Sequence, residues 1–92
     1  MKRAKKKVCI QGLGFVGSAM AIAVAIAKDS KDIPLYEVIG VDLPTNEGNK
    51  RVTSINNAVF PFMTTDENLN EALKEAINQG NLCATTDSSV YS

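Results

Sequence analysis

Apolar and polar positions along the chain fall into blocks that predict alternating strands and helices. The first block, Lys7 to Gln11, is a short β-branched run that ends at Gly12, a pattern typical of a strand buried on both faces of a parallel sheet. The next block, Phe15 to Lys28, lacks proline and is rich in alanine, which predicts a buried helix lying close on a sheet. Further strands are expected over Tyr36 to Asp42 and over Leu82 to Thr86.

Two more helices are predicted between the second and third strands. Leu43 to Gly48 has the composition of a surface loop, and Asn49 to Asn57 has the apolar spacing of a short helix. Ala58 to Thr65 contains a proline and is expected to be irregular, whereas Asp66 to Gly80 carries an N-cap candidate, an apolar stripe and a terminal glycine. This succession predicts an α/β fold: an incomplete Rossmann (doubly wound) unit with three parallel strands in the order 3-2-1 and crossover helices.

Composition and charge bound the organisation of the chain. Its 92 residues, 45% of them hydrophobic, allow one domain at most. We expect residues 1–7 to form a basic N-terminal arm, because they hold five of the ten Lys and Arg residues, and residues 8–92 to form the N-terminal part of a Rossmann domain. A basic run can also be a nucleic-acid or localisation signal, but no aromatic or Arg-rich face follows it. A solvated arm and no nucleic-acid partner are therefore the favoured interpretation.

The apolar segments and the cysteines exclude further classes of protein. The longest apolar stretch, Ala19 to Ala27, is far shorter than the roughly 20 residues that cross a bilayer, and Val8 to Ile10 is too short for a secretory signal. No membrane partner and a cytoplasmic location are expected. Cys9 and Cys83 lie in predicted strands without CxxC spacing, and the chain has no His. We therefore expect two buried thiols and no metal site.

The glycine motif Gly12-Leu13-Gly14-Phe15-Val16-Gly17 is the principal candidate site, because it lies between a predicted strand and a predicted helix. Gly12 permits the tight turn, Gly14 leaves room for a pyrophosphate, and Gly17 lets the helix pack closely on the strand. The backbone N–H groups of the first helical turn, where Phe15 and Val16 lie, would attract the phosphates. The motif therefore predicts a dinucleotide site, the alternative being a glycine-rich turn that binds no dinucleotide.

Asp42, at the end of the second predicted strand, is the candidate for binding the adenosine ribose. It follows the glycine motif at a spacing close to the roughly 20 residues expected of such an acid. Its carboxylate would accept hydrogen bonds from the ribose hydroxyls and repel a 2′-phosphate, so NAD is the expected cofactor. Lys50 and Arg51 lie near enough in the sequence to neutralise a phosphate, which leaves NADP as the alternative.

Four segments together resemble the nucleotide-sugar 6-dehydrogenases, which include UDP-glucose, GDP-mannose and UDP-N-acetylmannosamine dehydrogenases. They are Val8 to Gly17, Val38 to Asp42, Arg51 to Asn56 and Ala84 to Asp87, so the resemblance covers nearly the whole chain. It implies an oxidoreductase of polysaccharide biosynthesis that uses NAD to oxidise a sugar C6 alcohol to a carboxylate through a cysteine thioester. It also implies a nucleotide-sugar substrate, bound by later segments, and a homo-oligomeric full-length protein.

The same resemblance assigns roles within this chain. A basic residue beyond the ribose-binding acid helps hold the adenosine end in that family, and Arg51 is in register with it. Arg51 lies farther from Asp42 than is usual there, so Leu43 to Lys50 looks like an insertion. Cys9 and Cys83 match neither the position nor the setting of the family's nucleophile. No catalytic residue is therefore expected here, and the chain by itself should be inactive.

Two alternatives to this function stay open at this point. One is a non-catalytic Rossmann-type module that senses a nucleotide or binds a protein partner. The other is a hydroxyacid-type dehydrogenase that shares the glycine motif, and the segments Arg51 to Asn56 and Ala84 to Asp87 argue against it.

Overall fold

Three parallel strands and three α-helices form the part of the chain that the computed structural model describes, residues 6–64 and 66–91. The elements are, in order, β1 (Lys6–Gln11), α1 (Phe15–Ala25), β2 (Tyr36–Val41), α2 (Asn46–Asn56), α3 (Glu67–Gln79), β3 (Leu82–Thr85) and the 3-10 turn η1 (Ser88–Tyr91). The strands lie in the order β1-β2-β3, and both neighbouring pairs are parallel. The predicted α/β fold and its strand order are thereby confirmed.

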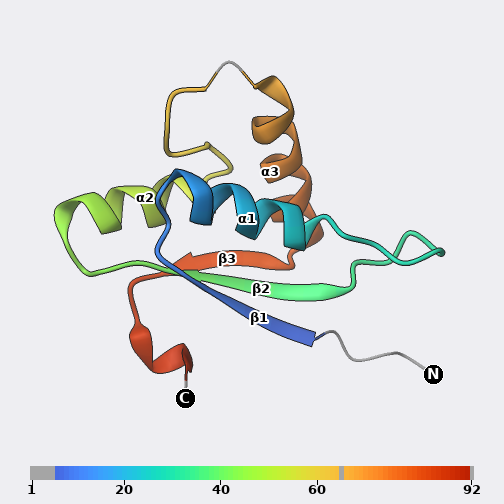
Figure 1. Cartoon of the computed structure of the whole chain (residues 1–92), viewed down its shortest axis with the longest axis horizontal. Helices are drawn as coiled ribbons and strands as arrows, with labels where there is room; N and C mark the ends of the chain where they lie inside the picture. Colours follow the sequence, from blue (N-terminus) through green and yellow to red (C-terminus); the bar gives the residue numbers. More distant parts are fainter. Residues whose placement is uncertain (1–5, 65, 92) are drawn as a thin grey trace.

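The three α-helices lie together on one face of the sheet (Figure 1). Helix α1 packs on β2 and on α3, while α2 packs on β3. The buried core fills the layer between the helices and the sheet and consists of Leu13, Ala21, Ile22, Ala25, Val38, Ile55, Phe60, Leu73, Ala76, Leu82 and Ala84. Apolar burial in this one layer is the main contribution to the stability of the fold.

The other face of the sheet carries the two cysteines. The strand register places Cys9 beside Ile39, and Ile39 beside Cys83, in one row across the sheet. Both thiols are exposed, so the expectation of two buried cysteines was wrong, as was that of a first strand buried on both faces. The reason is that successive strand residues point to opposite faces, and on β1 it is Val8 and Ile10 that pack against the core.

Helix α1 is shorter and more exposed than the sequence predicts. It ends at Ala25, so Lys28 lies beyond it. The Lys28 ammonium donates to the Glu75 carboxylate of α3 at 3.1 Å. On the outward face of α1, Val16 is 72% exposed and Met20 is 51% exposed. Only the face of this helix that meets the sheet and α3 is therefore buried.

Helix α2 begins earlier than predicted, at Asn46 instead of Asn49. Thr45 is its N-cap, and the Thr45 hydroxyl accepts a hydrogen bond from the Gly48 N–H at 3.0 Å. A side chain at Gly48 would overlap the Leu43 carbonyl oxygen, so the turn into the helix is tight. The predicted loop from Leu43 to Gly48 is in fact half turn and half helix.

The third helix and its flanks follow the prediction closely. The Asp66 carboxylate caps α3 by accepting from the Asn68 N–H at 3.0 Å, and Gly80 ends the helix in a left-handed conformation, with φ 77°. Residues 58–64 before it are irregular, as expected, while Thr65 lies outside the described residues. Most of the expected basic arm, residues 1–5, lies outside the described residues, whereas Lys6 and Lys7 belong to β1.

Asn81, just before β3, is a buried polar residue that joins three elements. Its side chain is 1% exposed and donates to the carbonyl oxygens of Ala25, at 2.7 Å, and Tyr36, at 2.9 Å. Its own carbonyl accepts from the Val38 N–H at 2.7 Å. The end of α1 and the start of β2 are thus held to β3 through one side chain and one carbonyl group.

Replacing Asn81 by alanine is expected to lower the free energy of unfolding by about 2 kcal/mol, because one buried and one partly buried carbonyl group lose their donor. Urea denaturation of the wild-type and variant chains measures the difference. Asn78→Ala is the control, since Asn78 is exposed on α3, and it should change the stability by less than about 0.5 kcal/mol. Equal losses in the two variants would contradict the role of Asn81.

Candidate functional site

The glycine turn connects β1 to α1 and is held by short hydrogen bonds. Gly12 has φ 82°, in the left-handed region that favours glycine, and its N–H donates to the Val41 carbonyl at 2.8 Å. Leu13 is fully buried, and its carbonyl accepts from the Ser18 hydroxyl at 2.9 Å. The turn is therefore fixed in place by β2 and by the first turns of α1.

Gly17 and Gly14 stand in very different surroundings. A side chain at Gly17 would overlap the Gly12 carbonyl oxygen, so only glycine lets α1 lie this close to the turn. A Cβ atom added at Gly14 would meet no atom within 4 Å, and the φ of Gly14, −63°, is accessible to any residue. The fold thus requires glycine at position 17 but leaves open space at position 14.

The N-terminus of α1 differs from those of the other two described helices. Thr45 caps α2 and Asp66 caps α3, whereas Gly14 offers α1 no side-chain cap, and the first turn of α1 contains no acidic residue. The first N–H groups of an α-helix have no partner inside the helix, and they carry the positive end of its dipole. Together with the open space at Gly14, these groups fit an anionic oxygen.

Asp42 follows β2 and binds the glycine turn through its carboxylate. One oxygen, Oδ1, accepts from the Leu43 N–H at 2.7 Å. The other, Oδ2, accepts from the Leu13 N–H at 3.2 Å and from the Arg51 guanidinium at 3.4 Å. The Asp42 side chain is only 9% exposed, so this carboxylate is packed against the glycine turn.

These contacts also decide the charge of Asp42. Partial burial alone would raise the pKa of this carboxyl group. The hydrogen bonds from the Leu43 and Leu13 N–H groups, together with the Arg51 guanidinium, outweigh that effect and hold the pKa below its ordinary value of 3.8. Asp42 is therefore negatively charged at neutral pH.

Arg51, on α2, reaches Asp42 despite the long segment between them. The early start of α2 at Asn46 turns the chain back and brings the guanidinium to the carboxylate. The guanidinium also lies 3.8 Å from the Glu47 carboxylate and 5.4 Å from the centre of the Phe62 ring. Arg51 thus contacts three parts of the chain: Asp42 at the end of β2, Glu47 of its own helix, and Phe62 of the loop before α3.

An aromatic cluster links that loop to the glycine turn. The Phe15 ring packs edge to face on the Phe60 ring, with ring centres 5.3 Å apart. The centre of the Phe15 ring also lies 5.8 Å from that of the Phe62 ring. Phe60 and Phe62 were not predicted from the sequence as site residues. The signal that could have found them is a pair of aromatics around Pro61 in a segment with no helix or strand pattern.

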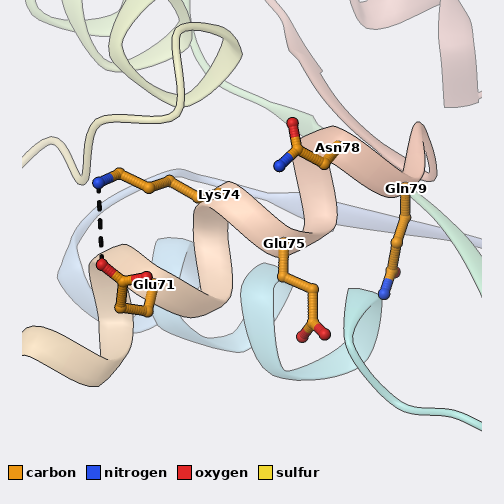
Figure 2. Close-up of a pocket in the computed structure, with 5 residues that line it drawn as sticks. All are labelled: Glu71, Lys74, Glu75, Asn78 and Gln79. Atoms are coloured by element: carbon orange, nitrogen blue, oxygen red, sulfur yellow. Dashed lines mark ion pairs between the residues drawn. The ribbon is translucent and has the colours of Figure 1, made fainter.

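Elsewhere in the described part of the chain, a hollow along α3 is a weaker candidate for a functional site. The hollow is shallow and has a volume of about 530 Å³. Its lining residues, drawn in Figure 2, are Glu71, Lys74, Glu75, Asn78 and Gln79. Its charges are already engaged, since Lys74 pairs with Glu71 at 3.8 Å and Glu75 with Lys28. No group of His, Cys, Asp and Glu in the described part of the chain could hold a metal ion. None of the described helices is long and apolar enough to cross a membrane.

Comparison with known proteins identifies related sequences. The profile of the UDP-glucose/GDP-mannose dehydrogenase family, NAD binding domain, matches residues 6–91. The UDP-N-acetyl-D-mannosamine dehydrogenase of Methanocaldococcus jannaschii is 40% identical over 81 residues, and that of Methanococcus vannielii is 38% identical over 85 residues. These alignments cover 88% and 92% of this chain but only 16% and 17% of the relatives, so the chain spans a small part of their length.

Solved structures show the same fold. An NDP-N-acetyl-D-galactosaminuronic acid dehydrogenase from Methanosarcina mazei Go1 superposes with a TM-score of 0.77 at 22% identity, over 90% of this chain and 16% of that one. A GDP-mannose dehydrogenase from Pseudomonas aeruginosa gives a TM-score of 0.64 at 29% identity, over 86% of this chain and 15% of that one.

Replacing Asp42 by asparagine should destabilise the chain by about 1 to 2 kcal/mol at pH 7, because an amide NH₂ replaces one of two oxygens that both accept hydrogen bonds. Since the pKa of Asp42 is lowered by folding, its stabilising effect is complete above the ordinary value of 3.8. The effect is lost as the pH falls through the folded-state pKa. Urea denaturation from pH 7 to about pH 2 should therefore show the two chains converging in acid.

Glu71→Gln provides the control for this measurement, because Glu71 is 75% exposed on α3. This variant should stay close to the wild type over the whole pH range. A stability difference between wild type and Asp42→Asn that is the same at every pH would contradict an electrostatic role for Asp42.

Proposed function

The chain belongs to the UDP-glucose/GDP-mannose dehydrogenase family, in its NAD-binding domain, and we propose that its glycine turn and Asp42 hold the pyrophosphate and adenosine ribose of NAD. Membership confirms the resemblance inferred from the sequence motifs, and with it NAD as the cofactor.

The open space at Gly14, beside an uncapped helix N-terminus, is the observation that carries this proposal. A pyrophosphate entering there would accept hydrogen bonds from the N–H groups of the first turn, at Phe15 and Val16, and would lie at the positive end of the helix dipole. Gly12 and Gly17 would act indirectly, Gly12 by shaping the turn and Gly17 by allowing α1 to approach it. The polar donors and the space both suit a phosphate group.

Asp42 supports the ribose end of the same proposal. A carboxylate offers about four acceptor sites, and three of those on Asp42 are taken by Leu43, Leu13 and Arg51. One acceptor site is left for a ribose hydroxyl, and the negative charge disfavours a 2′-phosphate. Arg51 would lie next to the ribose through its contact with Asp42. When bound, NAD supplies a hydride acceptor for the oxidation of an alcohol carbon.

We further propose that residues 8–92 form the N-terminal part of an NAD-binding domain in an oxidoreductase that converts the C6 alcohol of a nucleotide sugar to a carboxylate. The relatives named as UDP-N-acetyl-D-mannosamine dehydrogenases support this activity, although the chain covers only 16% and 17% of them. The catalytic residues and the sugar site would then lie outside these 92 residues. The full-length protein would be a homo-oligomeric, cytoplasmic enzyme of polysaccharide biosynthesis. It would have no nucleic-acid or membrane partner.

Gly14→Ala tests the pyrophosphate site without disturbing the fold. The added methyl group meets no atom of the chain, so the free energy of unfolding should change by less than about 1 kcal/mol. The same methyl group would stand where the pyrophosphate approaches, so the affinity for NAD should fall about tenfold or more. Urea denaturation and calorimetric titration with NAD measure the two effects separately.

Gly17→Ala is the matched comparison, because its methyl group would overlap the Gly12 carbonyl oxygen. This variant should lose stability by about 1 to 3 kcal/mol. If Gly14→Ala bound NAD as tightly as the wild-type chain, the proposed position of the pyrophosphate would be wrong.

A further inference from the structure

The Arg51 guanidinium could affect the choice between NAD and NADP. A positive charge beside the ribose can attract the 2′-phosphate that distinguishes NADP from NAD. In this structure the guanidinium is not free. It lies 3.4 Å from an oxygen of Asp42, 3.8 Å from an oxygen of Glu47 and 5.4 Å from the centre of the Phe62 ring. Two carboxylates therefore face one positive charge, and the group as a whole carries a net negative charge.

The position of Glu47 follows from how α2 begins. Thr45 caps the helix, which places Glu47 in its first turn and Arg51 four residues later. Side chains four residues apart lie on the same face of a helix, so Glu47 and Arg51 meet there. The segment from Leu43 to Lys50, which resembles an insertion in the sequence, thus adds a second carboxylate next to Arg51. Lys50 is exposed on this helix and takes no part in the ion pairs of the described residues.

We propose that Glu47 is a specificity-determining residue that favours NAD over NADP. It shares the Arg51 guanidinium with Asp42, so that this cation is not available to a 2′-phosphate, and its own charge repels that phosphate. Glu47 would act through Arg51 and through its charge, without touching NAD. The inference rests on the proposed function, because it requires the adenosine ribose to lie at Asp42.

Two small ligands isolate the contribution of the 2′-phosphate to binding. AMP and adenosine 2′,5′-bisphosphate share the adenosine 5′-phosphate and differ only in the 2′-phosphate. We therefore compare the ratio of their affinities in wild type, Glu47→Gln and Glu47→Lys, by calorimetric titration at low ionic strength. Glu47 is 83% exposed, so its replacement leaves the core intact.

Relative to AMP, binding of the bisphosphate should strengthen about threefold in Glu47→Gln and about tenfold in Glu47→Lys, the range expected for losing and then reversing one exposed charge. The gain should shrink in high salt, which screens exposed charges. Glu47→Asp retains the carboxylate and should keep a ratio near that of the wild type.

The matched controls are Glu71→Gln and Glu71→Lys. Glu71 is also exposed and also pairs with a basic residue of its own helix, Lys74, at 3.8 Å, but it lies on α3. These variants change the net charge of the chain equally and should leave the affinity ratio unchanged.

Three outcomes would overturn the inference. An unchanged ratio in the Glu47 variants, with AMP still bound by the wild type, would refute the role of Glu47 and leave the proposed function standing. A shift of equal size in the Glu71 variants would assign the effect to net charge and refute that role as well. Failure of the wild-type chain to bind AMP would refute the proposed ribose site together with this inference.

Discussion

The hydrogen bond from the Leu13 N–H to the Asp42 carboxylate, 3.2 Å long, joins the two parts on which the rest of the site depends. It ties the end of β2 to the turn between β1 and α1, and the Gly12 N–H adds a second link to Val41. Because the turn is fixed in this way, the start of α1 has one position relative to Asp42. The negatively charged Asp42 carboxylate and the positive N-terminal end of α1 therefore lie side by side at the same end of the sheet.

The same carboxylate organises the charges around it. Three donors surround Asp42 and keep it ionised, and one of them, Arg51, is in turn held by Glu47 and by the Phe62 ring. The positive end of α1, where we propose that the pyrophosphate binds, then lies next to a group of net negative charge, where we propose that a ribose with a free 2′-hydroxyl binds. This arrangement agrees with membership in a family whose matching domain binds NAD, and under the proposal these residues would favour NAD over NADP.

The sequence predicts those features of the fold that depend on local signals. The glycine motif, the cap at Asp66 and the left-handed Gly80 each act within a few residues, and the structure shows the corresponding turn and helix ends where they are expected. The exposure of Cys9 and Cys83 was missed because it depends on which face of the sheet the helices cover. The contacts of Arg51 could not be predicted either, since they depend on the turn into α2 near Gly48 and on one aromatic ring, Phe62, from the loop before α3.

The most direct test of the account is a titration of the ¹⁵N-labelled chain with NAD, followed residue by residue through the backbone amide signals. If NAD lies on the glycine turn and at Asp42, the largest shifts should occur at the amides of Gly14, Phe15, Val16 and Leu43, while those of α3 stay in place. Shifts confined to the α3 hollow of Figure 2, or none at saturating NAD, would contradict it.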